Sequence, residues 1–145
     1  MTWVCRGSDA MKRKSELRTV RPTNAELNIL RVLWRLGPST VRSVHEELSR
    51  VDRNLGYTTV LKFLQIMLDK GLVKREDSQR AHVYRPAVSR EQTQRQLTRQ
   101  LIDGAFDGSR SQLVLQALSG ADGVRPEELA EIRALLDRLQ GAQNN

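Results

Sequence analysis

The chain has 145 residues, of which 39% are hydrophobic and 28% charged, a composition typical of a soluble globular protein. No apolar run approaches the roughly 20 residues of a membrane-spanning helix and no secretory pattern opens the chain, so we expect no membrane insertion and a cytoplasmic location. Cys5 is the single cysteine, which excludes an intrachain disulfide.

The net charge of +7 is distributed unevenly along the chain. Residues 1–88 hold 17 lysines and arginines against 9 aspartates and glutamates, a net charge of +8. Residues 89–145 hold 7 against 8, a net charge of −1. This asymmetry is typical of a phosphate-binding module followed by a neutral partner-binding region.

Residues 1–21 show no hydrophobic periodicity and carry several basic side chains, Lys12, Arg13 and Lys14 among them. We expect a flexible basic N-terminal arm. One interpretation is an extension without function, because Met11 opens a plausible start of its own and the sequence does not decide between Met1 and Met11. The other is an arm that adds non-specific phosphate contacts.

Residues 22–87 predict a small domain. Thr23 and Glu26 have the spacing of a capping box, and Gly37-Pro38 ends the helix that follows. Thr40 can cap a second helix. The apolar positions that recur at helical spacing in these two helices are Leu27, Leu30, Leu33, Trp34, Val41, Val44 and Leu48.

Gly56 opens a third, amphipathic helix that closes at Lys70-Gly71. Its polar side chains fall within one narrow stripe, which consists of Thr58, Lys62, Gln65 and Asp69. Its apolar side chains lie opposite, Val60, Phe63, Leu64 and Met67, flanked by Leu61, Ile66 and Leu68. The simple interpretation is a core helix with one wet face; the functional one is a recognition helix, which offers base edges its N-terminal residues.

Two extended runs, residues 72–76 and 82–85, flank a polar loop with Arg80 at its tip, and Pro86 stops the second run. Three helices followed by a β-hairpin predict a winged helix-turn-helix. The alternative for the loop is a plain polar hairpin tip. The DNA-binding residues that this fold predicts are Tyr57, Thr58, Thr59, Lys62, Gln65, Lys74, Arg75 and Arg80.

Residues 88–141 predict three further helices. Ser89 and Gln92 form a second capping box, and this helix should run to about Asp107. A short helix is expected from Ser111 to Leu118 and a last one from Pro126 to Gly141, with residues 142–145 as a disordered tail.

Each of these helices carries a thin apolar stripe that cannot form a core alone. We therefore expect a homodimer in which the stripes interleave across a two-fold axis. The alternative is that they pack onto the winged helix of the same chain. The predicted dimerisation residues are Leu101, Phe106, Leu113, Leu115, Leu118, Leu129, Ile132 and Leu136.

Several short motifs together resemble the penicillinase-repressor (BlaI/MecI) family. They are Ala25-Glu26-Leu27 with Leu33-Trp34, then Tyr57-Thr58-Thr59-Val60-Leu61, then Asp69-Lys70-Gly71-Leu72-Val73. The resemblance covers about Pro22 to Leu139. It implies a mainly α fold with a small β-hairpin, a winged helix-turn-helix followed by a three-helix dimerisation region. It also implies a dimeric repressor that binds a palindromic double-stranded DNA operator, paired in many cases with a membrane metalloprotease sensor encoded nearby.

In some members of that family, cleavage within the short penultimate helix relieves repression. The matching stretch is Ser111–Leu118, and the Asn-Phe cleavage pair of the best-known members corresponds to Gln116-Ala117, a departure from the family pattern. Copper-responsive relatives carry a C-terminal cysteine cluster. The end of this chain holds no cysteine, so we expect no metal and no cofactor.

The sequence argues against an enzyme, because it has no phosphate-cradling glycine loop and no metal-ligand spacing. His45 and His82 stand alone, and we expect both to be solvated. The serious alternative is a winged helix used for protein–protein interaction without specific DNA binding. The net charge of +8 over residues 1–88 disfavours it.

Overall fold

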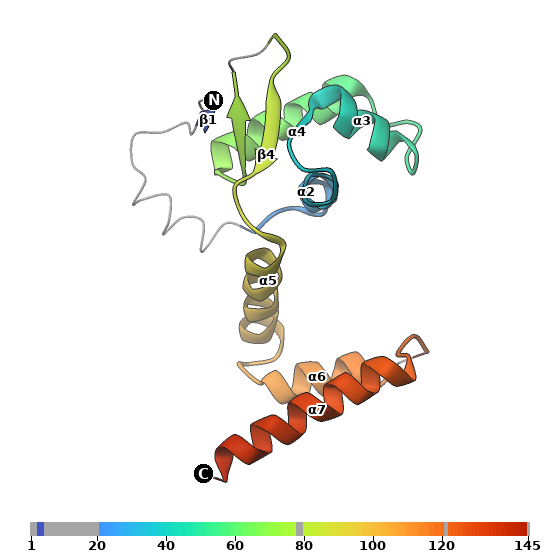
Figure 1. Cartoon of the computed structure of the whole chain (residues 1–145), viewed down its shortest axis with the longest axis vertical. Coiled ribbons are helices and arrows are strands. Elements are labelled where there is room, and N and C mark those ends of the chain that lie inside the picture. Colours follow the sequence, from blue (N-terminus) through green and yellow to red (C-terminus); the bar gives the residue numbers. More distant parts are fainter. Residues whose placement is uncertain (1–2, 5–20, 78–79, 121, 145) are drawn as a thin grey trace. The chain divides into compact units, whose positions relative to one another are not determined.

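Three helices lead into a β-hairpin in the first part of the chain: α2 (Asn24–Leu36), α3 (Val41–Ser49) and α4 (Tyr57–Lys70). The computed structural model describes residues 3–4, 21–77, 80–120 and 122–144. It divides the chain into two compact units, Met1–Thr98 and Arg99–Asn145. Figure 1 shows the three helices and the hairpin of the first unit. The division falls inside a helix rather than at the expected boundary between residues 87 and 88, which stays a prediction.

Local sequence signals set the ends of these helices. Thr23 Oγ1 accepts a hydrogen bond from Glu26 N at 3.2 Å, and Thr23 N donates to Glu26 Oε2 at 3.3 Å, which confirms the first capping box. Thr40 caps α3 through Ser43 N. Gly71 ends α4 with a φ of 79°, a left-handed conformation that favours glycine.

A four-stranded antiparallel sheet completes the first unit. The expected hairpin consists of β3 (Val73–Glu76) and β4 (Val83–Pro86), and Pro86 pairs with Val73 at its open end. Two short strands extend it, β1 (Trp3–Val4) beside β3 and β2 (Ser39–Thr40) beside β4, so that the order is β1-β3-β4-β2. The winged-helix prediction is confirmed, with a sheet larger than the hairpin alone.

Strand β1 corrects part of one expectation. Residues 1–21 were predicted as a flexible arm, yet Trp3 pairs with Glu76 and Val4 with Arg75. The pairing depends on an edge strand far along the chain, so no local pattern could reveal it. Residues 1–2 and 5–20 lie outside the described part of the chain, and so does Met11.

The hydrophobic core lies where α2, α3 and α4 meet the hairpin. Tyr84, Leu30, Leu33, Leu64 and Met67 have no exposed surface. Burial of each large apolar side chain is worth about 1.5 to 3 kcal/mol, so this cluster holds α4 firmly on its scaffold. The remaining members are Ile29, Val32, Val41, Val44, Val60, Leu68, Leu72 and Val73.

The chain continues through α5 (Arg90–Ala105), α6 (Arg110–Leu118) and α7 (Pro126–Gln143). Ser89 Oγ accepts from Gln92 N at 3.1 Å and Ser89 N donates to Gln92 Oε1 at 3.1 Å, which confirms the second capping box. Helix α5 ends slightly before the expected Asp107, whose φ of 49° turns the chain out of the helix.

Trp34 ties α2 to the beginning of α5. Its indole Nε1 donates a hydrogen bond to the carbonyl oxygen of Val88 at 2.9 Å. The guanidinium of Arg90 lies 5.8 Å from the centre of the indole ring, within the range of a cation–π contact. The first turn of α5 is therefore part of the first unit.

Candidate nucleic-acid interface

Helix α4 presents a strip of exposed side chains away from the core. We call this set the α4 strip, and it consists of Thr58, Thr59, Lys62, Gln65, Ile66 and Asp69. At roughly 100° per residue, these positions share one side of the helix. Val60, Leu64 and Met67 are fully buried on the opposite side. Core packing therefore determines which side of α4 faces outward.

The α4 strip carries chemistry suited to base edges in a major groove. Threonine hydroxyls donate and accept hydrogen bonds, a lysine reaches guanine or a phosphate, and a glutamine pairs with adenine. Ile66 is 38% exposed, and an apolar side chain here matches a thymine methyl group. From the sequence, Ile66 was assigned to the apolar flank of the helix because of its residue type. Its position around the helix, close to that of Lys62, was the signal that could have predicted its exposure.

The N-terminus of α4 adds a second feature. Its N-cap is Gly56, which supplies no side-chain hydrogen bond to the first turn. The first amide groups of a helix have no partner within the helix, and the helix dipole makes this end favourable for an anion. Tyr57, the first residue of α4, is 48% exposed beside them. This end of α4 can accept a phosphate oxygen.

The hairpin supplies the basic side chains of the wing. Arg80 is exposed; residues 78–79 of the same loop are not described. Lys74 is half-buried on β3. The hairpin and α4 belong to one unit and α4 packs against β3, so the predicted residues of both elements share one scaffold. Whether they contact DNA stays a prediction.

Arg75 is engaged within the wing itself. Its Nε lies 2.5 Å from Asp77 Oδ1, and its side chain is only 15% exposed. The hydrogen bond to Asp77 raises the pKa of Arg75, bonding to Tyr84 adds to the rise, and burial opposes both. The Nη2 of this guanidinium donates to Asp77 Oδ2 at 3.1 Å, so Arg75 is held by Asp77 and the exposed Arg80 is the better placed wing cation.

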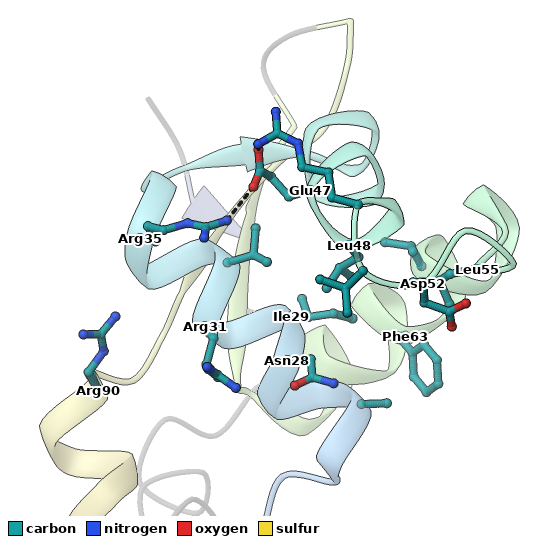
Figure 2. Close-up of a pocket in the computed structure, with 15 residues that line it drawn as sticks. Asn28, Ile29, Arg31, Arg35, Glu47, Leu48, Asp52, Leu55, Phe63 and Arg90 are labelled. Atoms are coloured by element: carbon teal, nitrogen blue, oxygen red, sulfur yellow. Dashed lines mark hydrogen bonds and ion pairs between the residues drawn. The ribbon is translucent and has the colours of Figure 1, made fainter. Parts of the chain in front are cut away.

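A groove lies between α2, α3, the linker of residues 50–55 and α4 (Figure 2). Its volume is about 710 Å³, and buried side chains such as Ile29 and Val60 form part of its wall. Glu47 lies between Arg35 at 2.5 Å and Arg50 at 3.3 Å. The lining holds no histidine, cysteine or hydroxyl side chain, so it offers no nucleophile with an adjacent base.

The described ranges contain neither a metal-binding cluster nor a membrane-spanning helix. No group of three or more His, Cys, Asp or Glu residues there is arranged to hold a metal ion. No helix among those residues has the length and apolarity needed to cross a membrane.

The second unit exposes apolar side chains instead. Neither α6 nor α7 contains a buried residue. Of the predicted dimerisation residues, Leu101, Leu115, Leu129 and Leu136 are exposed by 45%, 58%, 38% and 49%. The other four are half-buried: Phe106, Leu113, Leu118 and Ile132. Gln116 and Ala117, the pair at the predicted cleavage position, are both exposed on α6.

The comparisons with known proteins agree with this architecture. A family model described as "Penicillinase repressor" matches residues 22–138. Two relatives named "Transcriptional regulator BlaI", from Mycobacterium tuberculosis strains CDC 1551 / Oshkosh and ATCC 25618 / H37Rv, are each 35% identical over 114 residues. The match covers 78% of this chain and 80% of each relative. The chain therefore belongs to the penicillinase repressor family, a family of transcriptional regulators and not of enzymes.

Proposed function

We propose that this repressor acts as a homodimer that binds a palindromic DNA operator, with one α4 of each protomer in a major groove. The α4 strip would contact base edges and Arg80 of the wing would contact the adjacent backbone or minor groove. Because its target is chromosomal DNA, we expect the protein to work in the cytoplasm.

The observation that carries the proposal is the α4 strip itself. Four buried positions of α4, Val60, Leu64, Met67 and Leu68, fix the helix on its scaffold, so the strip projects as a rigid surface. It lies in the part of the chain that carries the net charge of +8 over residues 1–88. A rigid, mostly polar surface in a basic domain is suited to sequence-specific binding of duplex DNA.

The dimer part of the proposal is supported by the second unit. Helix α7 carries Leu129, Leu135, Leu136 and Leu139 along one side, each between 38% and 54% exposed. Exposed apolar stripes of this kind mark a protein–protein interface. The same stripe on a second copy of the chain would bury these leucines across a two-fold axis. Two-fold symmetry of the protein matches the symmetry of a palindromic operator.

The proposal is tested by selecting duplexes of about 30 base pairs from a random library with the wild-type protein. We call the recovered sequence the selected operator. It should be palindromic, and the protein should prefer it to random duplex by a factor of roughly 10³ or more. Equal affinity for both duplexes at low salt would instead support protein–protein interaction as the role of the winged helix.

A first prediction concerns the α4 strip. Lys62→Ala or Thr58→Ala should weaken binding to the selected operator by about 1 to 3 kcal/mol and change the base preference at one position in each half-site, because each removes one contact to base edges. Repeated selection with each variant measures the preference. Arg133→Ala, an exposed change on α7, should leave both quantities as in the wild type. Unaltered affinity and preference in the strip variants would contradict the assignment.

A second prediction concerns the wing. Arg80→Ala should lower the affinities for selected and random duplex by a similar factor, since a backbone contact carries no sequence information. The slope of log affinity against log salt should fall by roughly 1 for each protomer. Mobility-shift titrations at several salt concentrations measure it, with Arg138→Ala on α7 as the control. A change in base preference without a change in slope would argue against a phosphate contact.

Relief of repression by proteolysis, with a membrane metalloprotease as the partner, remains a prediction from the family. Its support here is local: Gln116 and Ala117 are exposed, and α6 buries no side chain that would resist unwinding.

A further inference from the structure

His45 occupies a different environment from the solvated one that the sequence suggested. It is half-buried on α3, and its Nε2 lies 2.8 Å from the carbonyl oxygen of Leu55. A carbonyl oxygen only accepts, so Nε2 must carry the proton and donate. The imidazole also meets the ring of Tyr57 edge-on, with 6.0 Å between ring centres and an angle of 78°.

These two contacts lie on either side of Gly56, the N-cap residue of α4. Leu55 precedes Gly56 and Tyr57 follows it. Gly56 provides no side-chain cap, and glycine is the residue least restricted in φ and ψ. The direction in which the linker enters α4 therefore needs an outside restraint, and among the contacts of the described residues His45 supplies one on each side.

The preceding linker is ordered by short-range bonds that stop before Gly56. Asn54 N donates to Asp52 Oδ1 at 3.1 Å, and Leu55 N donates to the carbonyl oxygen of Asp52 at 3.3 Å. The carbonyl of Leu55 is left for a partner from another element, and α3 provides it through His45. Because the linker is held at Leu55, the first turn of α4 has less conformational freedom.

We propose that His45 is a positioning residue for operator recognition: it fixes the linker carbonyl and the Tyr57 ring so that the first turn of α4 meets the bases in one orientation. The inference rests on the proposed role of α4. His45 acts through Leu55 and Tyr57 rather than by touching DNA, so it should govern the preference for operator over random duplex and not the number of phosphate contacts.

The test compares three variants by mobility-shift titration on the selected operator and on random duplex of equal length. His45→Leu keeps apolar bulk and removes the donor. It should weaken operator binding about tenfold, leave random-duplex affinity unchanged and leave the salt slope unchanged. His45→Gln keeps an N–H donor and should recover at least half of the lost preference on a logarithmic scale. His45→Asn, whose amide is too short to reach, should resemble His45→Leu and replaces it if that variant does not fold.

Ser39→Ala is the matched control. Ser39 Oγ donates to the carbonyl oxygen of Gly37 at 2.8 Å, a side-chain-to-backbone bond of the same length and partial burial but away from the entry to α4. The control should lose thermal stability to a similar extent and keep the full operator preference. That separates a loss of stability from a loss of positioning.

The inference is overturned if His45→Leu keeps the preference, if it weakens both duplexes equally, or if glutamine restores nothing. A flatter salt slope in His45→Leu would likewise overturn it, because His45 would then be a direct phosphate contact. If the wild-type protein itself shows no preference for any selected duplex, the proposed function fails, a result distinct from the failure of His45 as a positioning residue.

Discussion

Leu136→Asp should convert the proposed dimer to a monomer and weaken binding to the selected operator at least a hundredfold. Leu136 is 49% exposed on α7 within the uncovered apolar stripe. Loss of one buried leucine is worth about 1.5 to 3 kcal/mol, and a two-fold interface loses it twice, so the dimer dissociation constant should rise roughly a thousandfold. A monomer also loses the advantage of binding two half-sites at once. Sedimentation and mobility-shift titration measure the two effects.

Ala134→Asp is the matched control for that experiment. It places the same charge on the same helix at an exposed position, on the side opposite the leucine stripe. It should remain dimeric and bind the selected operator as the wild type does. If both variants dissociate, α7 is sensitive to charge anywhere and the stripe has no special role. If Leu136→Asp stays dimeric, the interface lies elsewhere.

Lys70→Met should remove about 2 to 4 kcal/mol from the free energy of unfolding, because it strands a buried carboxylate. Lys70 Nζ lies 2.6 Å from Glu26 Oε1, and the Glu26 side chain is only 3% exposed. The lysine side chain is 34% exposed, so water reaches it and a result in the lower part of that range is expected. Urea unfolding at fixed protein concentration measures the loss.

The double variant Glu26→Gln/Lys70→Met gives this prediction its test. A neutral amide can still accept from Thr23 N, which Glu26 Oε2 does at 3.3 Å, and needs no cation. We expect it to recover more than half of the lost stability. Lys62→Met, on the exposed strip of the same helix, should change stability by less than about 0.5 kcal/mol. A double variant less stable than Lys70→Met would refute the explanation.

The sequence revealed elements whose causes are local. The two capping boxes, Thr23 with Glu26 and Ser89 with Gln92, involve residues three positions apart, and both form. Helix α4 begins after Gly56 and ends at Gly71 as its pattern predicts. The exposed side of α4 was also correct at Thr58, Lys62 and Gln65, because helical geometry fixes which positions share a side.

The features that the sequence did not reveal depend on partners distant in the chain. Glu26 appeared only as a capping residue, whereas its main charge partner is Lys70, 44 positions away. Trp34 appeared only as an apolar residue, whereas its indole bonds to Val88, 54 positions away. Strands β1 and β2 have two residues each, too few to show the alternation of apolar and polar side chains that predicts a strand. His45 was predicted to be solvated because its hydrogen-bond partner, the carbonyl oxygen of Leu55, belongs to the linker and not to α3.

The proposed function requires the α4 strip of each protomer to enter the major groove, at two symmetry-related places on the operator. An iron chelate tethered to α4 tests it directly. Cys5 is the single cysteine of the chain, so a Cys5→Ser/Asp69→Cys variant carries the chelate only at the C-terminal end of the strip. On the selected operator, strand cleavage should cluster at two positions about one helical turn, or a multiple of it, apart. Cleavage scattered along the duplex, or no cleavage while the protein is bound, would contradict the account.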